Sequence, residues 1–164
     1  MVDVKSYSCF PTMIYEFKGI DKANHLKMSN IVDFENENNN NELHNHLAFY
    51  SFAKKVIECT KEIMRLNQYF FEDVEITNMW ANTLQQKESH PPHTHSNNFL
   101  SGVFYLHSDD LAGDIEFFDP RAQAGVLSPR IKKGNIENSN AVGFKPRENM
   151  GLVFPAWLQH WVKT

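Results

Sequence analysis

The chain has 164 residues and a formal charge of −4 at pH 7, from 16 Lys and Arg against 20 Asp and Glu. That length suits one domain, because the hydrophobic core of a single domain is generally built from about 100 to 200 residues. The sequence contains no run of Lys and Arg, so we expect neither nucleic acid nor an anionic membrane as a partner. With 41% hydrophobic residues and 13 Phe, the chain can build a sizeable core that is rich in β-sheet.

The cysteines and the start of the chain bear on the cellular compartment. Cys9 and Cys59 are far apart, which favours two free thiols in a reducing compartment over a single disulfide. Residues 1–5 do not combine a basic segment with a following apolar one. The apolar runs are also far shorter than the ~20 residues that span a bilayer. These features predict a soluble, cytoplasmic protein.

The first half of the chain predicts an extended segment, a loop and a helix. Residues 7–18 are rich in β-branched and aromatic side chains and predict extended structure. Residues 35–46 are polar and of low complexity, which predicts a mobile loop. Over residues 47–69 apolar side chains recur at steps of three and four. That period predicts one amphipathic helix that covers a sheet.

After Glu72 the helical period ends, and short strands separated by Gly, Pro and Asn are predicted. The strands are expected at residues 74–80, 99–106, 114–118 and 152–154. A long polar connection at residues 122–150 is expected to be functional or mobile, with room for an irregular hairpin. One helix followed by several short strands favours a β-sandwich or barrel over alternating strands and helices.

Residues 90–98, with the sequence HPPHTHSNN, are the most informative segment for chemistry. In an extended backbone, residues two apart face the same side, so His93 and His95 can direct their imidazoles at one point. A third ligand must come from elsewhere, and His160, in the apolar segment 154–161, is the obvious candidate. Imidazole ligands suit iron, zinc, copper and nickel, so the spacing predicts a metal site without selecting the metal.

Four other histidines are assigned structural roles. His44 and His46 form a second His-x-His, but they lie in the predicted loop, where no strand would hold them. We therefore expect no metal site there. His90 is expected to be a solvated loop residue, and His107 is expected to lie at a turn after a strand.

Five short motifs occur in the order in which one protein family has them. They are W-A-N at 80–82, H-T-H-S-N at 93–97, L-S-G-V-F-Y-L at 100–106, F-D-P-R at 118–121 and F-P-A-W-L-Q-H at 154–160. Together they resemble a family of 2-oxoglutarate- and Fe(II)-dependent oxygenases, over roughly the second half of the chain. The resemblance implies a double-stranded β-helix, a cupin-like jelly roll with a flanking helix and iron near one mouth. Residues 1–164 would then form a single oxygenase domain.

The resemblance also implies an activity. Such enzymes bind 2-oxoglutarate and O2 at the iron, release succinate and CO2, and usually hydroxylate a second substrate. The chain would then be an Fe(II)-dependent dioxygenase acting on an unidentified substrate, such as a protein side chain or a small metabolite, with ascorbate as a reductant. His93 and His160 match the first and last ligand positions of the family. His95 stands where the wider superfamily has the carboxylate of an HxD motif.

Three ways of completing the iron site therefore remain open. His95 is the favoured third ligand. A carboxylate from elsewhere is the second possibility, and the candidates are Asp114, Glu116 and Asp119. A site with two histidines completed by water is the third.

Side chains near the metal segment are candidates for other contacts. Tyr105 and Ser101 share a strand face and could bind the cosubstrate, although roles in the core or the strand ladder fit them as well. Asn82 precedes the metal segment on a predicted neighbouring strand and is a third candidate for the cosubstrate pocket. Trp80 and Trp157 are expected in the core.

The segment after His160 departs from the superfamily pattern. There, the strand after the last histidine supplies an Arg or Lys that pairs with the far carboxylate of 2-oxoglutarate, and Arg does so with two hydrogen bonds. Here only residues 161–164 follow, so we expect that strand to be missing and the activity of this chain to be weak or lost. The alternative is a natural end, with the cosubstrate held by Lys163, Arg121 or Arg147, or not held at all. A missing strand would expose a sheet edge, which predicts a homodimer through that edge.

Two functions from other classes compete with the oxygenase. A cupin-like protein that holds a metal or a small acid without catalysis is favoured by the missing Arg. A zinc hydrolase is also consistent with three histidines, but no general base is evident beside the site. Release of succinate would distinguish the oxygenase from the cupin-like binding protein.

Overall fold

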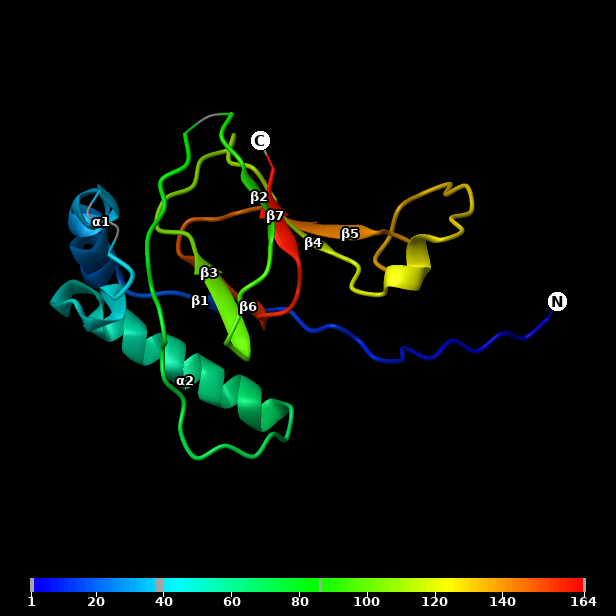
Figure 1. Cartoon of the computed structure of the whole chain (residues 1–164), viewed down its shortest axis with the longest axis horizontal. Coiled ribbons are helices and arrows are strands. Elements are labelled where there is room, and N and C mark those ends of the chain that lie inside the picture. The colour runs from blue at the N-terminus through cyan, green and yellow to red at the C-terminus, as the bar shows by residue number, and fades with distance from the viewer. Residues whose placement is uncertain (1, 38–39, 86, 164) are drawn as a thin grey trace.

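The computed structural model describes residues 2–37, 40–85 and 87–163. Within this part of the chain most helices come before most strands (Figure 1). The helices are α1 (Lys22–Glu37), η1 (Leu43–Asn45), η2 (Leu47–Phe49), α2 (Tyr50–Leu66) and η3 (Ala122–Gly125), where η is a 3-10 helix. The strands are β1 (Tyr15–Lys18), β2 (His90–His93), β3 (Leu100–Phe104), β4 (Ile115–Phe118), β5 (Ala141–Phe144), β6 (Met150–Pro155) and β7 (His160–Val162).

The strands form two antiparallel sheets. The first has the order β1-β6-β3, and the second has the order β2-β7-β4-β5. In the first sheet Val153 of β6 lies opposite Tyr15 of β1. In the second, His160 of β7 lies opposite His93 on one side and Phe117 on the other. Each sheet therefore has a late strand inserted between earlier ones.

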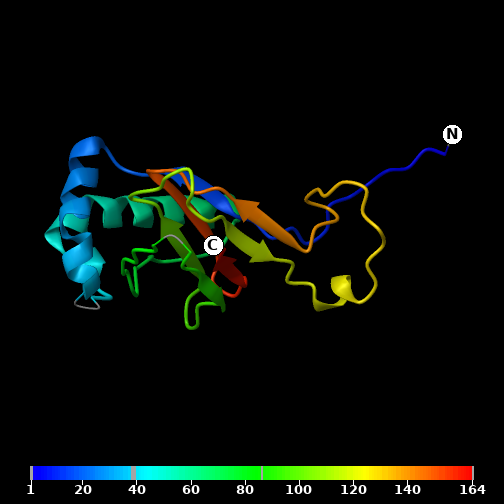
Figure 2. The same cartoon turned by 90° about the horizontal axis from the view of Figure 1, so that it is seen from above.

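Strand β6 separates two hydrophobic cores, which is why residues 150–154 are all buried. One core lies between the sheets, and its buried members are Ile115, Phe117, Met150, Leu152, Phe154 and Leu158. The other joins the first sheet to the helices, with Phe17 and Phe104 packed on Met28, Leu43, Phe49 and Phe52. The layers are thus helices, first sheet and second sheet. Figures 1 and 2 show α1 and α2 at the end of the molecule away from β5.

Helix α2 confirms the predicted amphipathic helix, and its first turn is the 3-10 helix η2. Phe52 and Ile63 are buried, at 5% and 4% exposure. The Phe52 ring lies 4.5 Å from the Phe104 ring of β3, so this face of the helix covers the first sheet. The prediction of a mainly β protein with a flanking helix is therefore confirmed.

A second helix, α1, was not predicted. Its sequence has few apolar residues, and its side chains facing the second core are mainly those of Met28, Ile31 and Val32. The predicted loop at 35–46 is wrong at both ends, because residues 35–37 complete α1 and Leu43 is buried at 1% exposure in η1. Residues 38 and 39 lie outside the described residues.

Two predicted strands differ from the structure. Residues 74–80, all described, form no strand, and a single parallel bridge from Met79 to Glu42 is their β contact. Partial burial of Val74 and Ile76 accounts for the alternation that favoured a strand. Within residues 7–18 only Tyr15–Lys18 is a strand, because only this part has β6 as a neighbour.

Two further expectations concern the cysteines and membranes. Cys9 and Cys59 are not bonded to each other, in agreement with the two predicted free thiols. Among the described residues, no helix has the length and apolar character needed to span a membrane.

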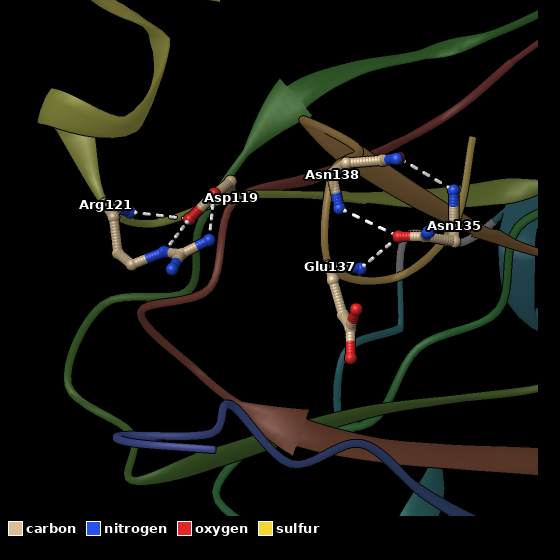
Figure 3. A network of polar contacts seen from close by, with 5 residues as sticks. All are labelled: Asp119, Arg121, Asn135, Glu137 and Asn138. Atoms are coloured by element: carbon tan, nitrogen blue, oxygen red, sulfur yellow. Dashed lines mark hydrogen bonds and ion pairs between the residues drawn. The ribbon is translucent and has the colours of Figure 1, made fainter. Parts of the chain in front are cut away.

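The connection between β4 and β5 is shaped by short-range hydrogen bonds (Figure 3). Arg121 donates from its backbone N and from Nε to one oxygen of Asp119, and from Nη2 to the other, at 3.0, 2.9 and 2.7 Å. Further along, the Oδ1 atom of Asn135 accepts from the backbone N of Glu137 and of Asn138. The turn at Asp119 is therefore closed by its own ion pair.

Candidate metal centre

Three histidines from separate places in the sequence converge at one end of the second sheet. His93 ends β2, His95 follows it by two residues, and His160 begins β7. The ring centroids of His93 and His160 are 4.4 Å apart, and His95 lies 5.1 Å from the first and 5.2 Å from the second. One nitrogen from each ring lies within 4.8 Å of the others. Among the described residues this is the one group of three or more such side chains close enough to hold a metal ion.

Backbone carbonyls orient two of the rings. The Nδ1 of His93 donates to the carbonyl oxygen of Pro91 at 2.8 Å, and the Nδ1 of His160 donates to that of Leu158 at 2.9 Å. A carbonyl can only accept, so the proton is assigned to Nδ1 and Nε2 keeps its lone pair. Such a contact is the usual way in which proteins orient a metal-binding histidine. The backbone N of His95 donates to the carbonyl of Ala156 at 2.9 Å, which ties its segment to the end of β6.

An irregularity in β2 positions the first histidine. His90 pairs with Val162 and His93 pairs with His160. Three residue steps along β2 therefore lie opposite two residue steps along β7. This is a β-bulge, and Pro91 and Pro92 occupy it. Prolines lack the N–H that a ladder needs, so within sheets they are found at edges and bulges, and β2 is an edge strand. The bulge carbonyl of Pro91 is the one that holds the His93 ring.

Burial favours the neutral form of two of the three histidines. His160 is 4% exposed, and burial lowers its pKa from 6.5 to about 4. The bond to Leu158 opposes this shift, and the neighbouring histidines add to it. Burial, followed by the proximity of His93, also lowers the pKa of His95. Neutral imidazole is the form that binds a metal ion, so the lowered pKa values keep His95 and His160 in the binding form at pH 7.

The three carboxylates considered as alternative ligands lie outside the histidine group. Asp119 pairs with Arg121, and Glu116 accepts from the indole Nε1 of Trp161 at 2.7 Å. Asp114 lies near Tyr105 and contributes to a raised pKa there. None of them belongs to the histidine group, which consists of three imidazoles. Such a set fits Fe(II), and its donor chemistry suits zinc, copper and nickel as well.

Ser101 lies on the strand face that looks toward this centre, and Tyr105 follows the same strand. Ser101 pairs with Phe154, whose ring is 4.7 Å from that of His160, and cross-strand partners share a face. Tyr105 packs against the core between the sheets. Its Oη is buried and has no hydrogen-bond partner among the described residues. Burial, followed by the charge of Asp114, raises its pKa. A buried hydroxyl without a partner marks a place where a polar ligand group would be stabilised.

Asn82 lies beside the site but bonds to its own neighbours. With its amide oriented by these contacts, Oδ1 accepts from the indole Nε1 of Trp80 at 3.0 Å and the nitrogen donates to the carbonyl of Ala81 at 3.1 Å. The Trp80 ring is 5.9 Å from that of His95. Asn82 thus holds the indole next to a histidine of the site.

The prediction that Trp80 and Trp157 lie in the core is wrong. They are 48% and 57% exposed. The core positions near them are taken by Phe154, Ala156 and Leu158, which alternate with Trp157 in burial.

The remaining predicted residues lie apart from the histidine group. Lys163 and Arg147, proposed as alternative holders of the cosubstrate, face carboxylates: Lys163 Nζ is 3.9 Å from Glu116, and Arg147 Nη2 is 2.7 Å from Glu16. The second His-x-His forms no metal group within the described residues. Its His46 instead accepts from the backbone N of Ala48 with Nδ1, which caps η2.

His90 is another residue near the site that the sequence did not predict correctly. It is not a solvated loop residue but the start of β2, partly buried, with its ring 5.9 Å from that of His93. Two consecutive prolines between the histidines were the available signal, because prolines inside a strand indicate a bulge.

Comparison with known proteins agrees with this geometry. No curated protein matches the chain. Residues 78–164, just over half of the chain and including all three histidines, match the family model described as "Putative 2OG-Fe(II) oxygenase". The chain therefore belongs to the 2OG-Fe(II) oxygenase family.

Proposed function

We propose that this chain is a non-haem, Fe(II)- and 2-oxoglutarate-dependent dioxygenase that hydroxylates an unidentified substrate and releases succinate and CO2. His93, His95 and His160 would hold the iron. The observation that carries the proposal is the convergence of three imidazoles, two of them with Nδ1 bonded to a carbonyl and Nε2 left with its lone pair. Family membership supports iron as the metal and 2-oxoglutarate as the cosubstrate.

The proposed domain comprises residues 1–164 as one jelly roll. Two antiparallel sheets that face a common core support this interpretation. The centre lies where β2 and β7 meet, at one end of that core, as the mouth of a jelly roll would.

The bound iron would supply the activation of O2 and the oxidation of 2-oxoglutarate. The protein's own residues prepare the site for both. Phe117 and Phe154 pack on the His160 ring at 5.7 and 4.7 Å, which excludes water from one side of it. The Oη of Tyr105 would donate to a carboxylate or keto oxygen of the cosubstrate, with Ser101 on the same face. Asn82 acts indirectly in this proposal, by holding Trp80 beside His95.

An anaerobic titration tests the iron and cosubstrate site. Purified protein is given Fe(II) and then 2-oxoglutarate, and the visible charge-transfer absorption of the ternary complex is followed. We expect the band in the wild type and its loss in His93→Ala and His160→Ala. His107→Ala is the matched control, because His107 is exposed and lies outside the histidine group, and it should keep the band. Absence of iron binding in the wild type would refute the proposal.

A second candidate is a cupin-like protein that binds a metal or a small acid without catalysis. The observation that favours it is the pairing of Arg121, Arg147 and Lys163 with carboxylates, which leaves none of them free for the far end of 2-oxoglutarate. Succinate formation in the presence of Fe(II), ascorbate and 2-oxoglutarate distinguishes the two. Succinate supports the oxygenase, whereas a ternary complex that forms no succinate under O2 supports the binding protein.

A further inference from the structure

A fourth imidazole, that of His90, lies beside the metal centre without belonging to it. In a regular strand, residues three apart face opposite sides of the sheet, so His90 and His93 would diverge. The bulge at Pro91 and Pro92 adds one residue and turns His90 to the side of His93. The resulting distance between their ring centroids is 5.9 Å, with the rings nearly perpendicular. Both histidines are partly buried, whereas the two prolines between them are exposed.

The nitrogens of His90 are available for a ligand. The ring is not part of the group whose nitrogens approach within 4.8 Å, so it does not complete the metal's donor set. Within the described residues the ring has no hydrogen-bond partner, and its ring contact is with His93. A neutral imidazole has one N–H donor whatever its tautomer. His90 therefore presents an unused donor next to the site.

The ligand of the proposed function needs such a donor. 2-Oxoglutarate is a dianion, and carboxylates in proteins are held by hydrogen bonds from N–H and O–H groups. The guanidinium and ammonium groups considered for this role are engaged by Asp119, Glu16 and Glu116. Tyr105 offers one hydroxyl, from the core between the sheets. His90 offers a further unengaged donor, at the β2 edge beside His93.

We propose that His90 donates a hydrogen bond to a carboxylate oxygen of the acid bound at the metal centre, and that the Pro91-Pro92 bulge exists to aim it there. The inference rests on the proposed function, with 2-oxoglutarate as the acid. In this proposal His90 contributes to the affinity for 2-oxoglutarate and does not contribute to the affinity for the metal. The two affinities can be measured separately, so the assignment is testable without turnover.

The variants are chosen to separate the N–H donor from the bulk of the ring. His90→Phe keeps a ring of similar size but has no donor, and His90→Gln keeps an N–H donor on a side chain of similar length. His107→Phe is the matched control, because it removes an exposed imidazole outside the site. The midpoints of thermal unfolding of all variants are compared first, so that loss of fold is recognised.

Each protein is titrated anaerobically with Fe(II) and then with 2-oxoglutarate, and the two dissociation constants are obtained separately. We expect His90→Phe to change the Fe(II) constant by less than about threefold and to weaken 2-oxoglutarate binding by about tenfold, the loss typical of one hydrogen bond to a charged group. His90→Gln should recover part of this loss, and His107→Phe should resemble the wild type.

The other outcomes are distinct. Unchanged affinity for 2-oxoglutarate in His90→Phe overturns the role of His90 while the proposed function stands. Loss of Fe(II) binding in a folded His90→Phe protein also overturns it, because His90 would then be a ligand. A wild type that binds Fe(II) but not 2-oxoglutarate refutes the proposed function and the inference that rests on it.

Discussion

Acidification of the metal-free protein should reduce its stability through His160. In the folded state burial holds the pKa of this residue at about 4, whereas in the unfolded chain it returns to the ordinary value of 6.5. Between these values the unfolded chain binds a proton that the folded protein does not. The free energy of unfolding therefore falls as the pH falls from 6.5 to about 4, and it is unaffected by this group above pH 6.5.

The size of the effect follows from the two pKa values. A difference of one pKa unit corresponds to about 1.4 kcal/mol, so lowering the pKa from 6.5 to about 4 corresponds to up to about 3 kcal/mol. That is a large fraction of the roughly 5 to 15 kcal/mol by which domains are stable. Bound metal should steepen the dependence, because protons and metal compete for the same nitrogens.

Urea unfolding in the presence of a chelator, at several pH values from 7.5 to 4.5, measures the contribution of His160 to the free energy of unfolding. His160→Gln is the comparison, because it cannot titrate while the carboxylates that respond near pH 4 are retained in both proteins. We expect the wild type to lose up to about 3 kcal/mol more than the variant across this range. Parallel losses in the two proteins would refute the link between burial of His160 and acid sensitivity.

Three further substitutions test other parts of the structure. Tyr105→Phe removes a buried hydroxyl that has no hydrogen-bond partner among the described residues. It should leave the free energy of unfolding unchanged or raise it by about 1 kcal/mol, while it weakens 2-oxoglutarate binding. Reduced stability with unchanged binding would contradict this. Gly151→Ala places a Cβ against the ring of Phe17, and should destabilise the protein by about 1 to 3 kcal/mol in urea unfolding, with partial recovery in a double variant that also carries Phe17→Leu. Trp80→Phe should reduce the quenching of tryptophan fluorescence by added Cu(II) more than Trp157→Phe does. Of these two described tryptophans, Trp80 is the one whose ring contacts a histidine of the site. Equal reductions would argue against the position of Trp80.

The candidate site was largely predictable because it depends on short-range geometry. Two histidines two residues apart can share one side of extended backbone, and the structure brings His93 and His95 to 5.1 Å between ring centroids. The convergence of His160 depends on strand register, which no local pattern specifies. Its apolar surroundings in the sequence were an indirect signal, since they correspond to the contacts with Phe117 and Phe154.

What the sequence failed to predict has specific physical causes. His90 was placed in a loop because periodic rules assume regular strands, and a bulge changes the side that a residue faces. Helix α1 was missed because its apolar period is weak, and it is held mainly by tertiary contacts around Met28. The strand expected at residues 74–80 did not form, because alternation alone provides no partner to pair with.

The position of β6 has a consequence for how the chain folds. This strand pairs with β1 on one side and β3 on the other, and the register joins Tyr15 to Val153 across most of the sequence. During synthesis β1 emerges first and has no strand to pair with until β6 is made. Contacts so distant in sequence slow folding, because the intervening chain must be ordered before they form. We therefore expect slow folding with a long-lived unpaired edge on β3, and a higher yield of native protein when translation and folding proceed at low temperature.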